Sequence, residues 1–231
     1  MHQIIAKTRQ DYNRIASLYA KTRNAARELE QFADFVQKGQ KVLDWGCGNG
    51  RLVHLLKNKD VEYYGIDQSS EMIRVAKEEF AREVQEGWVH FECNEEGKLN
   101  FSENFFDLVF AIASVHHLPD PDTRLNFFKD IFLKLKKGGL FIMTNWNLES
   151  AWAQEKFKKD WQKIGENDYL IPWKNQEGEI LVERYYHHFN FHELQELLEK
   201  VGFSIEKWYY ARGVEKVVPE EGKNLVVIAK K

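Results

Sequence analysis

The sequence predicts an α/β fold: a mostly parallel sheet of seven strands, helices on both faces and an antiparallel hairpin at one edge. Three observations lead to this prediction. Short apolar runs alternate with helical segments along residues 41–144, a pattern typical of βα units. The runs have the length and apolar content of strands buried on both faces. One more helix and two strand-like runs near the C-terminus then supply the antiparallel edge.

The individual elements follow from apolar periodicity and from Gly and Ser signals. We expect an N-terminal helical cap over residues 1–39, ended by Gly39. Ser69 or Ser70 caps the helix that reaches residue 85, and Gly138 and Gly139 end the helix that begins at residue 123;. The expected strands are residues 41–45, 61–66, 88–93, 107–112 and 140–144, a strand from Gly202, and residues 224–229.

The regular alternation loosens after Asn145. Residues 151–164 form a helical pattern rich in lysine, and residues 168–173 form an irregular stretch. Because inserted connections often carry recognition residues, we expect residues 145–190 to contact the substrate.

Composition indicates one folded domain over residues 1–231. Hydrophobic residues make up 43% and charged residues 30% of the chain, and no repeat or linker divides it;. Cys47 and Cys93 lack ligand spacing, so we predict neither a disulfide nor a metal site, and a cytoplasmic location;. No apolar run reaches the roughly 18 residues of a membrane span. A secretory signal is not predicted either.

A glycine-rich loop follows the first expected strand, in the order Asp44-Trp45-Gly46-Cys47-Gly48-Asn49-Gly50. Glycines permit positive φ and let a ligand approach the backbone, while the helix that follows offers free N–H groups. Asp67 ends the second strand and is followed by Gln68. A carboxylate at that place can accept both hydroxyls of a ribose. Loop and carboxylate together predict a nucleoside-containing ligand.

This order resembles motifs one and two of class I methyltransferases, which have a Rossmann-like fold. The resemblance covers about residues 40–145 and implies S-adenosyl-L-methionine as the cofactor. It implies that Gly46, Cys47 and Gly48 surround the cofactor, that Asp44 faces its amino-acid end and that Asp67, with Gln68, holds the ribose. A tight turn without a ligand and an NAD site are the alternatives.

Further positions match the family in order. Asn94 or Glu95, just after the third strand, would meet the adenine amino group, and the sequence leaves open which one does so. Ala111 to Ser114, at the end of the fourth strand, would supply backbone beside the sulfonium. Tyr12 would either cover the cofactor or pack in the core.

A narrower resemblance lies outside the cofactor half. The segments concerned are similar to the "VPW … RYYHVF" pattern and N-terminal signature of the wobble-uridine tRNA carboxymethyl methyltransferases, including the methyltransferase half of AlkB-fused homologues. These segments are Tyr12-Asn13-Arg14-Ile15-Ala16, Lys21-Thr22-Arg23, Ser114-Val115-His116-His117-Leu118, Ile171-Pro172-Trp173 and Arg184-Tyr185-Tyr186-His187-His188-Phe189.

That resemblance implies esterification of a carboxylate, which is ionised at pH 7 and needs alignment and a cationic clamp rather than a strong base. Arg23, Arg184 and His116 are the candidate clamp, and Tyr185 or Tyr186 would donate to the base or stack on it. The alternatives without a role in substrate binding are a surface ion pair for Arg184, a solvated helix face for Arg23 and a packing role for His116.

Two features depart from the family pattern. The net charge is −3, where relatives carry more basic surface, and the insertion before Arg184 is short. A small-molecule oxygen, nitrogen or carbon acceptor is therefore the alternative to tRNA, and a non-catalytic binding subunit is a third reading. If RNA binds, the lysines within residues 156–163 are the first candidates for phosphate contact. Eukaryotic relatives act with a small zinc-binding activator subunit; without one, we expect a monomer.

Overall fold

The computed structural model describes residues 3–22, 27–95 and 97–231. Its main sheet has the strand order β10-β9-β11-β5-β4-β1-β2-β3. Strands β1 to β5 are parallel, while β11 runs antiparallel to β5 and β9, and β10 antiparallel to β9. The strands are β1 (Lys41–Trp45), β2 (Glu62–Asp67), β3 (Val89–Cys93), β4 (Phe106–Ile112), β5 (Leu135–Trp146), β9 (Ser204–Arg212), β10 (Glu215–Val217) and β11 (Asn224–Lys230).

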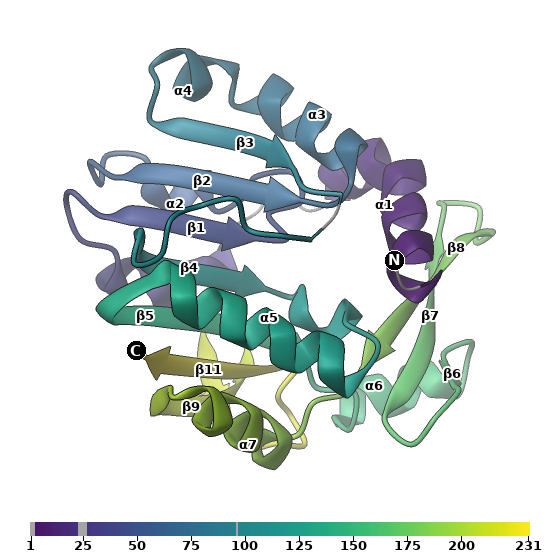
Figure 1. The fold of residues 1–231 in the computed structure, drawn as a ribbon. Coiled ribbons are helices and arrows are strands. Elements are labelled where there is room, and N and C mark those ends of the chain that lie inside the picture. Colours follow the sequence, from purple (N-terminus) through teal and green to yellow (C-terminus); the bar gives the residue numbers. More distant parts are fainter. Residues whose placement is uncertain (1–2, 23–26, 96) are drawn as a thin grey trace.

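This architecture confirms the predicted Rossmann-like α/β class, with its mostly parallel sheet and antiparallel edge (Figure 1). The seven expected strands are present, and the three-residue strand β10 lengthens the edge. The helices are α1 (Gln3–Thr22), η1 (Arg27–Phe35), α2 (Val53–Leu56), α3 (Ser70–Glu79), α4 (Ala81–Gln85), η2 (Val115–His117), α5 (Pro121–Lys134), α6 (Ala151–Phe157) and α7 (Phe191–Val201).

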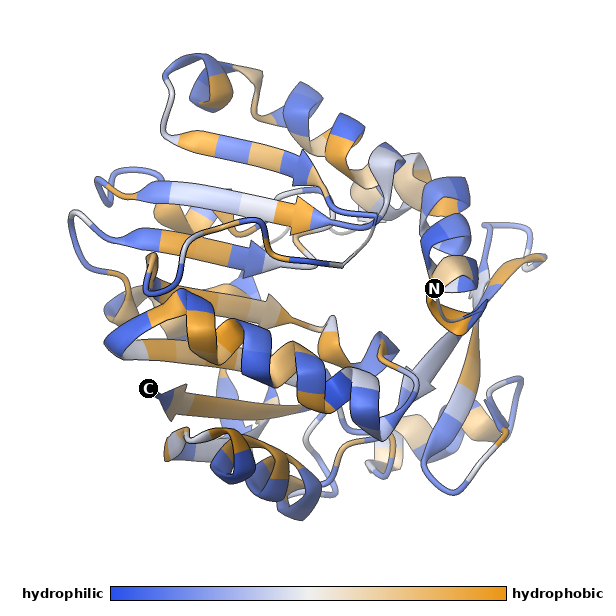
Figure 2. Cartoon of the chain, in the orientation of Figure 1, coloured by the Kyte–Doolittle hydropathy of each residue, from blue (hydrophilic) through white to orange (hydrophobic). Residues whose placement is uncertain are grey.

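Two apolar clusters fill the space on the two faces of the sheet. One joins η1, α2, α3 and α4 to one face, and the other joins α5 and α7 to the opposite face. Figure 2 shows the corresponding stripes of hydrophobic and hydrophilic residues on α5 and α7. Because the strands are buried on both sides, they are apolar along most of their length. No helix among the described residues has both the length and the apolar content to cross a membrane.

Local signals set the helix ends. Ser69 caps α3 by accepting from the Met72 N–H, as predicted;. Helix α5 begins after the Asp120 cap and ends at Lys134, earlier than expected. The prediction that Gly138 and Gly139 end this helix is wrong, because both glycines lie within β5.

The segment between β5 and α7 forms a second, antiparallel sheet in the order β6-β7-β8. Its strands are β6 (Gln162–Lys163), β7 (Asp168–Lys174) and β8 (Ile180–His187). The irregular stretch and the long helix expected here are therefore wrong: α6 is short, and residues 168–174 are a strand. Pro172 obscured this strand, but it lies beyond the short β6, on an edge that needs no N–H donor;.

Strand β8 brings the second sheet back to the main one. It packs against α1 and η2, and α1 also packs on α3, so residues distant in sequence meet above the carboxyl ends of β1, β2 and β4. The site lies at this place.

Candidate active site

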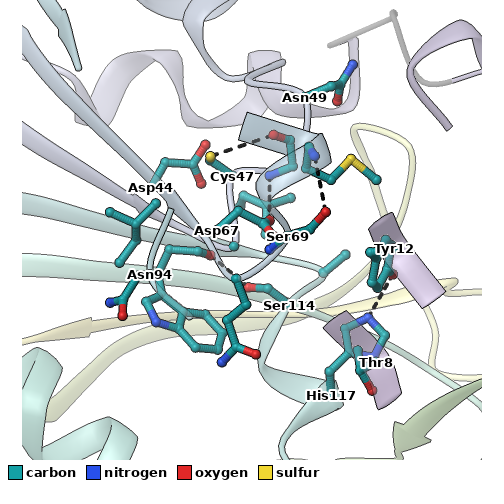
Figure 3. A pocket seen from close by; sticks show the side chains of 18 of the residues that line it. Thr8, Tyr12, Asp44, Cys47, Asn49, Asp67, Ser69, Asn94, Ser114 and His117 are labelled. Atoms are coloured by element: carbon teal, nitrogen blue, oxygen red, sulfur yellow. Dashed lines mark hydrogen bonds between the residues drawn. The ribbon is translucent and has the colours of Figure 1, made fainter. Parts of the chain in front are cut away.

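The glycine loop lines a cavity at the carboxyl ends of β1 and β2 (Figure 3). Gly46 has φ +72°, and a Cβ added there would lie 2.5 Å from the Cβ of Ser114. Gly48 has φ +56°, and a Cβ there would meet nothing closer than Tyr19, at 4.0 Å. Gly46 is therefore required for packing, whereas Gly48 leaves its backbone open to a ligand.

Asp67 organises the loop from the end of β2. Its carboxylate accepts from the N–H of Gly48 at 2.9 Å and from the N–H of Ser69 at 2.8 Å. Burial raises the pKa of this carboxyl;. Each backbone bond occupies one lone pair, so both oxygens retain acceptor capacity toward the cavity that Asp67 lines;.

Asp44 is 3% exposed and lines the same cavity. The Tyr63 hydroxyl donates to its Oδ2 at 2.9 Å. Burial raises the pKa of Asp44 to about 7, against the smaller opposing effect of that hydrogen bond;. The cavity is also lined by Asn49, whose buried Oδ1 has no hydrogen-bond partner among the described residues. Sequence analysis did not single out Asn49 beyond its place in the loop.

The two residues left open after the third strand take different places. Asn94 lines the cavity, and its Nδ2 donates to the carbonyl of Lys98 at 2.6 Å. Its Oδ1 can therefore accept a hydrogen bond from another group. Glu95 is not among the residues that line this cavity. Its side chain is 58% exposed and pairs with Arg9 at 2.6 Å.

Of the other residues expected at the cofactor, some line the cavity and one does not. Cys47, Gln68 and Tyr12 line the cavity. Ala111 does not, because its side chain is fully buried in the cluster on the α5 side of the sheet. The other three residues expected beside the sulfonium, Ile112, Ala113 and Ser114, line the cavity.

His117 connects this cavity to β8. Its Nδ1 lies 2.7 Å from the carbonyl oxygen of Tyr185, and its Nε2 lies 2.9 Å from the Tyr12 hydroxyl. A carbonyl can only accept, so Nδ1 carries the proton and Nε2 accepts from Tyr12. Burial lowers the pKa of His117 to about 3, so the ring is neutral at pH 7;.

The chain of hydrogen bonds continues into a second cavity, which shares Tyr12 with the first. The Tyr12 oxygen accepts from Nη1 of Arg184 at 3.2 Å. All hydrogen bonds of this chain therefore run the same way. Arg184 donates to Tyr12, Tyr12 donates to His117, and His117 donates to the Tyr185 carbonyl. Sequence analysis missed His117, although it adjoins the candidate His116.

Arg184 is a buried cation in an unusual setting. It is 3% exposed, and its guanidinium lies 5.1 Å from the ring of Trp173, 5.3 Å from Tyr186 and 5.7 Å from Tyr12. No carboxylate of the described residues lies within ion-pair distance of it, and its Nε has no hydrogen-bond partner there. The surface ion pair considered above for Arg184 does not form, either with Glu183 or with Glu179. A buried charge is costly unless it is paired, so this setting favours an anionic ligand.

His116 lines the second cavity beside Arg184. Its ring lies 4.6 Å from that of Tyr186, and its Nδ1 accepts from the Trp146 N–H at 3.4 Å. Burial lowers the pKa of His116 well below its usual range. The ring is therefore neutral with the proton on Nε2, which makes that atom a donor.

Tyr185 faces away from both cavities. Its hydroxyl donates to Asp168 at 2.6 Å and lies 3.1 Å from the carbonyl oxygen of Pro119. Neighbouring residues of a strand point to opposite faces, so Tyr186, not Tyr185, accompanies Arg184 in the second cavity;. Of the two tyrosines left open, the structure brings Tyr186 to the site. The candidate Arg23 lies outside the described residues.

Comparison with known proteins identifies the class. Residues 36–202 match the model of the "Methyltransferase domain" family, so the chain belongs to that family. It is an enzyme that uses S-adenosyl-L-methionine as its methyl donor.

Named relatives are similar over most of the chain. The tRNA (carboxymethyluridine(34)-5-O)-methyltransferase of Schizosaccharomyces pombe is 28% identical over 92% of this chain and 95% of that protein. The like-named protein of Xenopus tropicalis is 28% identical over 64% of this chain, a match that spans only 22% of its own length. Sterol 24-C-methyltransferase of Aspergillus fumigatus is 31% identical, but over 52% of this chain.

Solved structures agree on the fold. A SAM-dependent methyltransferase from Methanosarcina mazei superposes with a TM-score of 0.67 and 27% identity, covering 86% of this chain and 95% of that one. The CcbJ methyltransferase of Streptomyces caelestis reaches a TM-score of 0.74 at 16% identity, over 97% of this chain and 98% of that one. The latter likeness shows the fold alone.

Proposed function

We propose that this enzyme methyl-esterifies the carboxylate of 5-carboxymethyluridine at the wobble position of tRNA. The observation that carries the proposal is Arg184, a buried guanidinium with an unpartnered Nε and no carboxylate of the described residues beside it. Such a group fits an anionic acceptor, and a planar fork of N–H donors fits a carboxylate in particular.

The first cavity fits S-adenosyl-L-methionine residue by residue. The lone pairs left on Asp67 suit two ribose hydroxyls, and the free Oδ1 of Asn94 suits the adenine amino group. Asp44 and the orphaned Oδ1 of Asn49 suit the ammonium of the amino-acid end. When bound, the cofactor supplies a methyl group on a positively charged sulfur.

The chain's own residues then align the acceptor. Arg184 holds the carboxylate, and the Nε2–H of His116 donates to it. Tyr186 and Trp146, whose rings stack on each other 4.9 Å apart, line the second cavity. One carboxylate oxygen forms a bond to the methyl carbon as the carbon–sulfur bond breaks. No proton moves, so catalysis rests on the alignment of the two groups.

A hydroxyl or amine acceptor would need a group to take its proton, and the second cavity lacks a free one among its described lining residues. Nδ1 of His116 already accepts from a backbone N–H, and burial disfavours its protonation. The lining carboxylate, Glu28, is paired with Arg51. An acceptor that is already ionised therefore suits this cavity better than a neutral metabolite.

The printed names of the relatives support the same acceptor. Proteins named for carboxymethyluridine(34) methylation match this chain over most of its length in Schizosaccharomyces pombe and over 70% of it in Saccharomyces cerevisiae. The match to the sterol enzyme covers about half of the chain.

The test is direct labelling. The enzyme is incubated with S-adenosyl-L-methionine carrying a labelled methyl group and with tRNA from cells that lack this methylation, and the tRNA is digested to nucleosides. We expect label in the methyl ester of 5-carboxymethyluridine, removable by mild base. Label that enters a metabolite extract but no nucleoside would overturn the tRNA proposal.

Replacing Tyr12 by Phe should weaken the acceptor side without weakening cofactor binding. The change removes the donor to His117 and the acceptor for Arg184, so the guanidinium loses its anchor. We expect kcat/KM for tRNA to fall roughly 5- to 30-fold, as for one or two hydrogen bonds worth about 1 kcal/mol each. Tyr19→Phe, on the same wall but outside this chain of bonds, is the control; an equal loss there would contradict the role of the Tyr12 hydroxyl.

Cofactor affinity should depend on pH through Asp44. With a pKa of about 7, this carboxyl is protonated at lower pH and then cannot pair with the ammonium of the ligand. The Kd for S-adenosylhomocysteine, measured by calorimetry, should therefore rise about tenfold between pH 8 and pH 6. Asp44→Asn should bind more weakly with a flatter profile, and a wild-type Kd that is constant over this range would refute the assignment.

A further inference from the structure

Two lysines on the edge strands lie over one tyrosine ring. The Nζ atoms of Lys207 and Lys216 are 5.8 Å and 4.8 Å from the ring centre of Tyr209. Both lysines are exposed, and neither forms an ion pair with a carboxylate of the described residues. The proximity of Lys207 lowers the pKa of Lys216. Two adjacent cations without a counter-charge form a local basic surface on a chain whose net charge is −3;.

This surface is continuous with the second cavity. Lys207, Tyr209 and Ala211 alternate along β9 and so share one face of the sheet, and Lys216 of β10 is the register partner of Ala211;. Ala211 itself lines the cavity. Lys216 therefore lies next to a residue of the cavity wall, and Lys207 lies farther along β9 on the same face.

Lys223 adds a cation to the same cavity wall, on the other side of Ala211 from Lys207. It lines the cavity, its Nζ lies 5.3 Å from the ring centre of Trp152, and its backbone N–H donates to the carbonyl of Ala211. No carboxylate of the described residues lies within ion-pair distance of its ammonium. An aromatic ring with a cation above it suits a nucleotide, since one can contact a base and the other a phosphate.

The lysines that the sequence put forward for phosphate contact are in a different situation. Lys158, just after α6, pairs with Glu155 at 2.5 Å. Lys156, Lys159 and Lys163 form no ion pair with a carboxylate of the described residues, but none of the four lysines lines the second cavity. The β9–β10 edge, in contrast, adjoins a residue of the cavity wall, Ala211.

We infer that the RNA strand lies against Lys223 inside the acceptor cavity, leaves the cavity at Ala211 and crosses the β9–β10 edge, where Lys207 and Lys216 contact its phosphates. This inference rests on the proposed function, because it takes tRNA as the substrate. Phosphate contacts set the position of the strand and bring the carboxymethyl group to Arg184, while adding little to the recognition of sequence.

The test compares two charge-matched double variants. Lys207→Ser with Lys216→Ser removes the proposed surface. Lys129→Ser with Lys200→Ser removes two exposed lysines from α5 and α7, on the opposite face of the sheet. For each variant and the wild type, the Kd for tRNA is measured by fluorescence anisotropy at several salt concentrations, together with kcat and KM for methylation and the Kd for S-adenosylhomocysteine.

We expect the Lys207/Lys216 variant to bind tRNA roughly 5- to 10-fold more weakly at low salt. Its slope of log K against log salt should fall in magnitude by about 1.5, because each phosphate contact contributes about 0.7–0.9. Its kcat at saturating tRNA and its cofactor Kd should equal those of the wild type, and the Lys129/Lys200 variant should match the wild type throughout.

Equal salt slopes for the two double variants, with tRNA still methylated, would overturn the strand path and leave the proposed function standing. If the wild type neither binds nor methylates tRNA, the proposed function itself fails, and the path with it. A loss of cofactor binding in the Lys207/Lys216 variant would show that these lysines support the fold.

Discussion

Replacing Arg184 by Met should abolish most turnover of tRNA while leaving the protein as stable as before or more so. The guanidinium is buried among three aromatic rings, with no carboxylate of the described residues within ion-pair distance; Asp11 acts on it only from farther away. Removing one partner of a buried charge pair costs about 3–5 kcal/mol. If the missing partner is the acceptor carboxylate, kcat/KM should fall between roughly 100-fold and several thousand-fold.

Stability should move in the other direction. An apolar side chain of similar length fills the same ring-lined space without the desolvation of a charge, and such exchanges are often neutral or stabilising. The thermal midpoint measured by calorimetry should therefore hold or rise, and the Kd for S-adenosylhomocysteine should stay within a few-fold. Arg184→Lys keeps the charge but loses the planar fork, so we expect intermediate activity.

These measurements separate a functional arginine from a structural one. A lower midpoint together with lost cofactor binding would mean that Arg184 supports the packing of β8 against Tyr12. An unchanged kcat/KM in Arg184→Met would exclude it from the acceptor site altogether.

Replacing Asp67 by Ala should raise the Kd for S-adenosylhomocysteine about 100-fold or more. The ribose hydroxyls would enter the site without an acceptor, at about 1–3 kcal/mol for each unpaired buried group. The N–H groups of Gly48 and Ser69 also lose their partner, but they lose it in the free enzyme as well. That second loss should appear as a lower thermal midpoint in the absence of ligand.

Two further variants complete this experiment. Asp67→Asn keeps one carbonyl acceptor, so its Kd should lie between those of the wild type and the alanine variant. Asp34→Ala removes an exposed carboxylate on η1 and should change neither quantity. A Kd for Asp67→Ala within threefold of the wild type would remove Asp67 from the ribose site.

The cofactor half was predictable because its information is local. Asp44, the glycines and Asp67 lie at the ends of two strands that pair directly, so the strand–loop–helix order already places them together. The limit appears at single residues. Ala111 is the next-to-last residue of a predicted strand, but its side chain faces the α5 side of the sheet, and the cavity wall begins one residue later. A shift of one position in a strand reverses the face, and apolar runs do not reveal such a shift.

The acceptor half was less predictable because it depends on contacts between distant segments. Pro172 obscured strand β7, so its pairing partner β8 was not recognised either. Without β8, the alternation of side chains that separates Tyr185 from Tyr186 could not be applied. The neighbouring histidines divide by contacts that no spacing reveals: His117 bonds to Tyr12 and the Tyr185 carbonyl, while His116 stacks on Tyr186.

The sequence by itself determined the α/β class, the position of the glycine loop and the use of S-adenosyl-L-methionine. The class and the loop follow from periodicity and from residues that adjoin along the chain, whereas the cofactor followed from the resemblance of the loop and Asp67 to class I methyltransferases. Only the tertiary structure decided that Arg184 is buried without an ion-pair partner among the described residues, that Tyr12 links it to His117, and that Lys207 and Lys216 meet on β9–β10. Burial and charge balance depend on which segments meet in space, because each side chain's partners come from elements far away in the chain.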